Sequence, residues 1–173
     1  MFLLMFGAVM LGFMLIALIG VTAPKKPLPD LHDLSGDSSP LLDLDAEQLG
    51  KIVAVILDKM GLELDRASGG RGGELEIFAE NPTPVTGGKI LVHCVPAPPE
   101  TGTVNGLRVA RFVRAVRSAY VSKGLMFTTG DITPDGWLEA EDAPVELFDR
   151  GQLQDMIDEH LGGMTQAELE AMN

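Results

Sequence analysis

The chain has a single cysteine, Cys94, and only one tyrosine and one tryptophan among its 173 residues. One cysteine cannot form an internal disulfide, which favours a reducing compartment. The scarcity of Tyr and Trp leaves few aromatic surfaces on which nucleic-acid bases could stack.

Positive charge is scarce as well. The formal net charge is −12 at pH 7, and the part of the chain after Lys26 holds 11 of the 13 basic residues and all 25 acidic residues. A surface of this sign repels phosphate backbones and anionic lipids at long range. The composition therefore argues against generic nucleic-acid binding, although it leaves room for a local basic groove.

Residues 1–23 contain no charged side chain. This run exceeds the roughly 20 residues that a helix needs to cross a bilayer core. A cleaved signal peptide is the alternative, but such peptides have a basic segment before a shorter apolar core. Here no Lys or Arg precedes the run, and Pro24 follows the small residues that would form a cleavage site. We therefore expect an uncleaved transmembrane helix, with the membrane as a partner.

Two lysines, Lys25 and Lys26, follow the apolar run directly. Because positively charged flanks tend to stay in the cytoplasm, we expect a single-pass protein of the inner membrane with a cytoplasmic C-terminal domain. Residues 24–44 are rich in Pro, Ser, Asp and Gly, which is typical of a flexible linker.

Periodic patterns divide the rest of the chain into one domain, residues 45–161, and a tail helix at 162–173. The pair Asp45 and Gln48 has the capping-box spacing that begins a helix. Apolar residues at spacings of three and four indicate helices, and alternating or continuous β-favouring runs indicate strands. Strands are expected at 62–65, 74–80, 89–95, 124–129 and 145–149, and helices after Asp45, at 103–122, after Thr133 and at 150–161.

The expected order is therefore α-β-β-β-α-β-α-β-α. Continuous apolar runs at 89–95 and 124–129 are typical of central, buried strands. Long helices join the later strands, which predicts an α/β fold with a mixed sheet and helices on both faces.

Several motifs in this order resemble one known family. The first helix ends in DKMGLEL, a glycine-rich turn leads into GGELEIFAE, and the strand KILVHC precedes the long helix. The most specific piece is KGLMFTTGDITPDGWLEAEDAPVELFDRGQLQDMI, with a strand ending in Thr-Thr-Gly, a short helix, a strand ending in Asp and a closing helix. Residues 45–161 thus resemble the Mrr-type restriction endonuclease domain, a branch of the PD-(D/E)xK nucleases.

The resemblance implies a restriction-endonuclease-like mixed sheet and Mg²⁺-dependent cleavage of DNA. In that family an Asp on the second strand and a Glu or Gln on the third hold the metal, and a Lys two positions later supports the attacking water. Carboxylates suit a hard cation, and metal and ammonium stabilise the charge that builds on phosphorus. In this chain the Asp falls on Glu76, the Gln on His93 and the Lys on Val95. The implied catalytic residues are Glu76 and His93, with Glu76 as the metal ligand.

Other positions of the family pattern also differ. The acidic residue early in the first helix falls near Gly50, with Glu47 one turn away, and the acidic glycine turn reads Gly-Arg-Gly-Gly at 70–73. Lys89 shares a strand face with His93 but lies roughly 13 Å from it at about 3.3 Å per residue. We therefore expect a pseudoenzyme without a cofactor, and Mg²⁺ as the cofactor only if the nuclease site is active.

The neighbours His93 and Cys94 raise the question of a reactive pair. Successive side chains of a strand point to opposite faces, so these two cannot form a close couple. We expect Cys94 to be a small core residue. We expect His93 to face a pocket with Glu76, where it is either satisfied by a neighbouring carboxylate or part of a His/Glu transition-metal site, for which two ligands are few.

Four arginines recur every third residue in the long helix: Arg108, Arg111, Arg114 and Arg117. Steps of three drift by about 60° around a helix, so the side chains form a spiral. They are either a solvated face paired with nearby acids or a residual phosphate-binding groove.

Together these patterns predict a membrane-anchored, Mrr-like protein that has lost hydrolysis and acts in binding or scaffolding. The alternative is a divergent metal-dependent DNA endonuclease that uses Glu76 and His93. The partner is DNA or an unknown protein.

Overall fold

The structure is a computed structural model that describes residues 40–70, 73–85 and 87–162. The expected anchor at 1–23, most of the linker and the tail helix lie outside these residues. No helix in the described part combines the length and apolar character that crossing a membrane requires. The elements are η1 Pro40–Asp43, α3 Ala46–Lys59, β1 Glu63–Gly69, β2 Leu75–Asn81, β3 Gly88–Val95, β4 Thr103–Val104, α4 Gly106–Ser118, β5 Lys123–Thr128, β6 Asp131–Ile132, α5 Pro134–Ala140, β7 Val145–Phe148 and α6 Arg150–Leu161.

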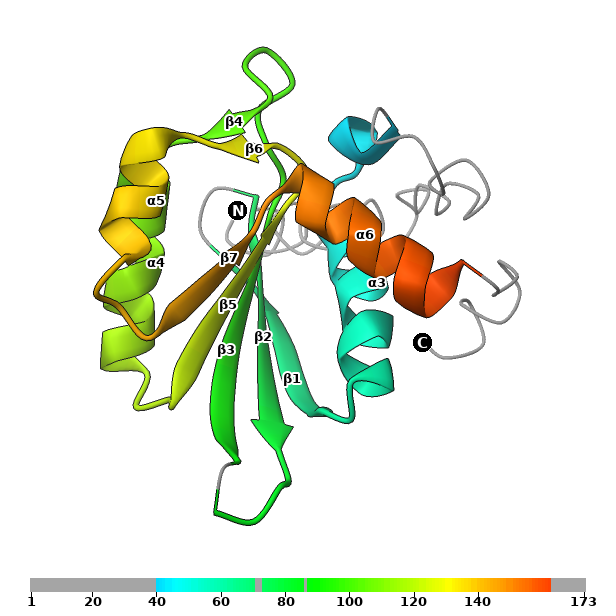
Figure 1. Cartoon of the computed structure of the whole chain (residues 1–173), viewed down its shortest axis with the longest axis vertical. Coiled ribbons are helices and arrows are strands. Elements are labelled where there is room, and N and C mark those ends of the chain that lie inside the picture. The colour runs from blue at the N-terminus through cyan, green and yellow to red at the C-terminus, as the bar shows by residue number, and fades with distance from the viewer. Residues whose placement is uncertain (1–39, 71–72, 86, 163–173) are drawn as a thin grey trace, which may run out of the picture.

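A five-stranded mixed sheet runs through the domain in the order β1-β2-β3-β5-β7 (Figure 1). Strands β1, β2 and β3 are antiparallel neighbours, whereas β3, β5 and β7 are parallel. The parallel pairs are joined through α4 and α5, as parallel strands require a crossover. The expected mixed sheet is therefore confirmed, as is the order of its five strands and the four helices around it, whereas the two short strands β4 and β6 were not expected.

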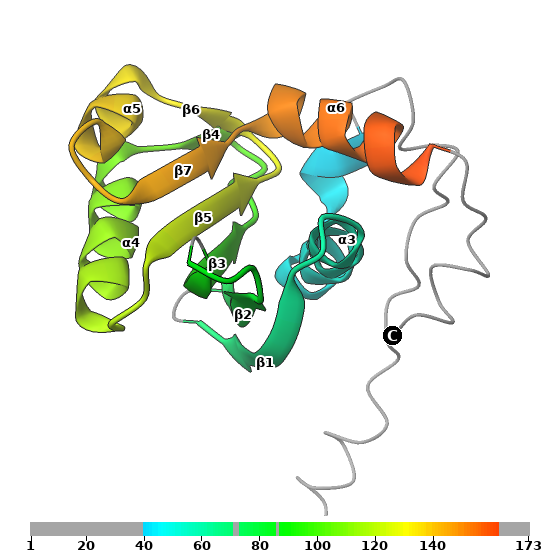
Figure 2. The same ribbon diagram turned by 60° about the horizontal axis from the view of Figure 1, so that its bottom comes forward.

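Helices cover both faces of the sheet (Figure 2). Helices α3 and α6 lie on one face, and α4, with α5 beside it, lies on the other. Two apolar clusters result. The α3/α6 cluster includes Ile56, Val92, Cys94, Phe127 and Leu153, and the α4/α5 cluster includes Leu91, Val95, Phe112, Val116 and Met126.

Capping signals place two of the helices. Asp45 is the N-cap of α3 and exchanges side-chain and backbone hydrogen bonds with Gln48, as expected. Asp149 and Gln152 form the same capping box at the start of α6. Helix α3 stops where Gly61 adopts a φ of 80°, a conformation that glycine reaches without strain.

The long helix starts later than expected. Residues 103–122 were expected to be helical, but α4 begins after the N-cap Asn105 and ends at Ser118. Thr103 and Val104 instead form β4, which pairs with β6. A two-residue strand is too short to show a period of its own, and its partner is distant in sequence.

The folded elements extend beyond the bounds expected from the sequence at two places. Strand β1 reaches Gly69, although the pattern indicated a strand only at 62–65, and all seven of its residues are exposed at the sheet edge. At the other end, Leu41 and Leu44 are buried in the α3/α6 cluster. The last residues of the expected linker thus pack as part of the core.

Candidate functional site

Strand β3 presents His93 and Cys94 to opposite faces of the sheet. Cys94 belongs to the α3/α6 cluster and has no exposed surface. Its burial raises the pKa of the thiol, because the thiolate would lose its hydration. Cys94 is therefore a core residue, as predicted, and is not paired with His93.

On the other face, His93 lies against β2 and α4. Glu76 is its direct neighbour in the antiparallel register, and the distance from His93 Nε2 to Glu76 Oε1 is 3.1 Å. The imidazole stacks on the Phe112 ring, with centroids 5.2 Å apart. His93 Nδ1 is buried without a hydrogen-bond partner among the described residues. The structure thus brings together the two residues expected at the site.

A second acid, Glu74, joins this pair. Its Oε2 lies 3.8 Å from His93 Nε2, and its side chain is only 13% exposed. Sequence reasoning did not select Glu74, although it precedes Glu76 by two positions and strand alternation places both on one face. Alternation alone could therefore have found it.

Helix α4 supplies the one basic side chain that contacts this group among the described residues. Arg108 Nε lies 4.0 Å from Glu74 Oε1, and its Nη1 donates to the Pro96 carbonyl at 3.2 Å. Pro96 directly follows β3, so Arg108 ties the start of α4 to the end of that strand. We refer to Glu74, Glu76, His93 and Arg108 as the acidic-histidine cluster.

Val95 occupies the last position of β3 on the same face as His93. It is 1% exposed and packs in the α4/α5 cluster. Its partner in β5 is Thr128, which is fully buried. The position on which the resemblance places the lysine is therefore buried and occupied by a side chain that packs in the α4/α5 cluster.

The first-helix position of the family pattern lies elsewhere. A Cβ atom added at Gly50 would collide with the Leu75 side chain, and Leu75 packs against the α3/α6 cluster. Glu47 and Gly50 line a pocket of about 380 Å³ with Leu75 and Ile77. Both residues are thus on the opposite face of the sheet from the Glu76 carboxylate.

The side chains of the acidic-histidine cluster that could bind a metal ion already contact one another. Glu76 Oε1 contacts His93, and Glu74 is shared between His93 and Arg108. Within the part of the chain that the structure describes, no group of three or more His, Cys, Asp or Glu side chains is arranged to hold a metal ion.

The order of strands and helices and the position of this cluster define a restriction-endonuclease-like fold. The chain matches the structure of the DNA modification-dependent restriction endonuclease AspBHI with a TM-score of 0.51 and 14% identity, over 87% of this chain and 43% of AspBHI. It also matches MspJI restriction endonuclease in complex with a 27-mer oligonucleotide, with a TM-score of 0.43 and 22% identity, over 78% of this chain and 31% of that one. The chain thus spans less than half the length of either protein.

Residues 41–157 match the family of the Mrr catalytic domain, described as "Restriction endonuclease". The match covers more than half of the chain, and the chain therefore belongs to the Mrr-type restriction endonuclease family. A comparison with curated proteins finds no match.

Proposed function

We propose that this chain is a membrane-anchored member of the Mrr family that binds DNA without hydrolysing it. Family membership supports DNA as the partner. The loss of hydrolysis is supported chiefly by Val95, which stands where the resemblance expects a lysine and is 1% exposed among apolar side chains. Without an ammonium group there, nothing at that position stabilises the charge that develops on phosphorus.

The acidic-histidine cluster fits the Mg²⁺ ion of the family poorly. Mg²⁺ prefers oxygen ligands in near-octahedral geometry, and it is commonly held by one or two carboxylates. Here one Glu76 oxygen is 3.1 Å from an imidazole nitrogen, and Glu74 is shared with Arg108. Mg²⁺ bound at Glu76 Oε1 or at Glu74 would compete with these contacts, so no hydrolytic step is assigned to this site.

Anchoring is supported by the sequence alone. Residues 1–23 lack charge, and Lys25 and Lys26 follow them, so the domain is proposed to face the cytoplasm from the inner membrane. A reporter fused after Asn173 tests this topology. Activity of a reporter that works only outside the cytoplasm would contradict the proposed orientation.

DNA binding and cleavage are tested together with the full chain. Methylated and unmethylated duplexes are incubated with Mg²⁺ or Mn²⁺, and both products and retained DNA are measured. We expect retention at low salt and no cleavage. Cleavage that Glu76→Ala abolishes would show that the chain is a nuclease.

The second candidate function is a divergent metal-dependent endonuclease. Its supporting observation is that the Glu76 and Glu74 carboxylates lie 3.1 Å and 3.8 Å from His93 Nε2. The cleavage assay separates the two candidates. Neither cleavage nor retention of DNA would indicate a protein partner and contradict both.

A further inference from the structure

Helix α4 carries three exposed arginines without acidic partners. No carboxylate in the described ranges lies within 4.0 Å of Arg111, Arg114 or Arg117. This contradicts the simpler expectation that nearby acids would neutralise them. We call these three residues the arginine face.

Four basic side chains outside α4 have acidic partners, whereas Lys59 and Lys89 form no ion pair within 4.0 Å among the described residues. Ion pairs join Lys51 to Glu47, Arg66 to Asp65, Lys123 to Glu146 and Arg150 to Asp131. In a chain of net charge −12, acidic partners are abundant. Three successive unpaired arginines on one helix are therefore a local excess of positive charge.

The geometry of α4 presents these arginines together. Residues three apart rise by about 4.5 Å and turn by about 60° backwards, so Arg111 to Arg117 cover about 9 Å and a third of the circumference. Arg111 Nε donates to the Leu107 carbonyl at 3.5 Å, and Arg114 Nε donates to the Ala110 carbonyl at 3.3 Å. These bonds hold the inner ends of the guanidinium groups against the helix and leave their Nη atoms for a partner.

The arginine face also continues from the acidic-histidine cluster. Arg108, one turn before Arg111 on the same helix, contacts Glu74. Asp135 of the neighbouring α5 is turned towards the helix start, where it accepts from the Gly106 N–H at 2.9 Å. Its charge is therefore directed to the helix N-terminus and away from the arginine face.

We infer that the arginine face is the surface on which this domain holds a phosphodiester backbone. The inference rests on the proposed DNA-binding function and names its contact surface. Guanidinium groups match phosphate oxygens with two parallel hydrogen bonds, and duplex DNA offers one charge about every 1.7 Å of its axis. Such binding is independent of base sequence, because it reads only the backbone.

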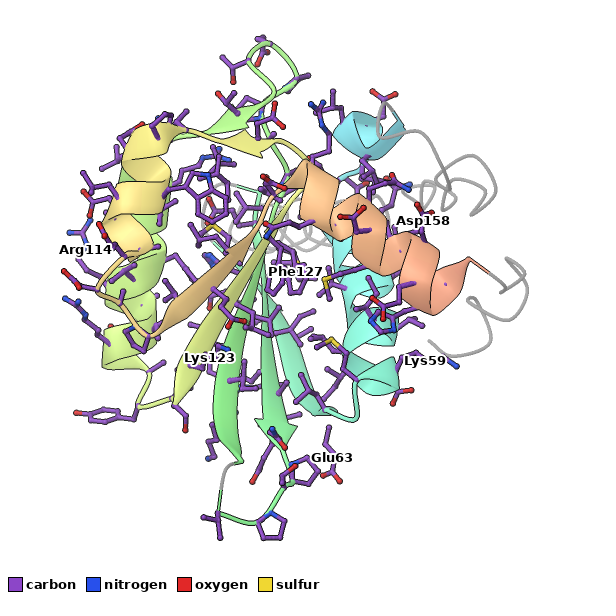
Figure 3. The ribbon with its side chains drawn as sticks, viewed as in Figure 1. Lys59, Glu63, Arg114, Lys123, Phe127 and Asp158 are labelled. Atoms are coloured by element: carbon purple, nitrogen blue, oxygen red, sulfur yellow. The ribbon has the colours of Figure 1, made fainter. Side chains whose placement is uncertain are left out.

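The matched variants are two charge-removing pairs. Arg111→Gln/Arg114→Gln removes two charges from the arginine face, and Lys51→Gln/Lys59→Gln removes two from α3. Arg114 and Lys59 project on opposite sides of the molecule (Figure 3). Gln has a helix propensity close to those of Arg and Lys, so all three proteins are expected to fold alike, which circular dichroism checks.

The full-length proteins are titrated with a fluorescent duplex at several salt concentrations without divalent metal. We expect the arginine pair to weaken binding by about tenfold and to reduce the slope of log K against log salt by about 1.8, or about 0.9 per lost phosphate contact. The lysine pair is expected to leave both quantities unchanged.

Two results would overturn the inference, and they can be told apart. Equal loss in both pairs, or none in either, would mean that DNA is held elsewhere, while the proposed function stands. No retention of the duplex by the unaltered chain would remove the proposed function itself. In that case, salt-sensitive capture of anionic vesicles or an acidic peptide by the arginine face would assign it to that partner.

Discussion

The two faces of the central sheet carry different kinds of side chain. The face under α3 and α6 is apolar along the whole of β3, with Ile90, Val92 and Cys94 in one cluster. The face under α4 interrupts Leu91 and Val95 with His93, which contacts two carboxylates. One face thus supplies packing energy, while the other gives up part of its packing to hold a polar group. The acidic-histidine cluster lies on the α4 face, and the apolar packing on the α3/α6 face holds β3 in place beneath it.

The largest expected effect lies in the apolar face. Phe127 is fully buried, stacks on Phe148 with centroids 4.6 Å apart and lies between the sheet and α6 (Figure 3). Phe127→Ala is expected to lower the free energy of unfolding by about 4 kcal/mol through lost burial and a cavity. Denaturant unfolding measures this. Phe78→Ala, at a half-buried position on the other face, is the control, and an equal loss there would erase the contrast.

A charge introduced on the α4 face of the sheet tests whether water reaches the end of β3. Val95→Lys inserts an ammonium group where the valine is 1% exposed. We expect a loss of about 3 kcal/mol in stability, because the charge must be desolvated or the side chain displaced. Val95→Met is the apolar control in the same unfolding experiment. A stable Val95→Lys protein that cleaves DNA with Mg²⁺ would instead show that only the lysine was missing.

The contact between His93 and Glu76 is expected to be worth less. A double-mutant cycle with His93→Gln and Glu76→Gln should give a coupling free energy of about 1 kcal/mol, because the 3.1 Å contact joins a partly exposed carboxylate to a buried ring. Urea unfolding of the four proteins provides the value. A coupling near zero would mean that the two side chains are neighbours without stabilising each other.

The smallest effect concerns Asp135 at the start of α4. The Thr133 hydroxyl and then the Gly106 N–H favour its charged form and lower the pKa of the carboxyl. Its contribution to stability is therefore present above the ordinary Asp value of about 3.9 and is lost as the pH falls through the lowered pKa. Thermal midpoints of the unaltered chain and Asp135→Asn should converge as the pH falls from about 5 to about 2. Asp142→Asn, in the exposed turn after α5, is the control and should show no such convergence.

The fold was largely predictable because its signals are local. Capping at Asp45, the proline at the start of α5 and the apolar run of β3 each depend on a few neighbouring residues. Strands β4 and β6 were missed because two residues carry no period and their pairing joins distant segments. The same reason explains the late start of α4.

The candidate site was predictable in part. Alternation and the family resemblance together brought Glu76 and His93 to one face, where the structure places them 3.1 Å apart. The contact of Arg108 with Glu74 depends on how α4 crosses the end of β3, which no local pattern encodes. The absence of acidic partners beside the arginine face is likewise a property of the packed surface in the described part of the chain.

The position of Cys94 has a practical consequence. The only thiol of the chain is fully buried in the central strand, and its burial disfavours the reactive thiolate. A thiol reagent can therefore reach it only when the two layers around the sheet separate. The rate of Cys94 labelling therefore measures how often the folded domain opens, and it needs no engineered probe. The measurement can be made in a membrane or a cell extract, where optical unfolding curves fail.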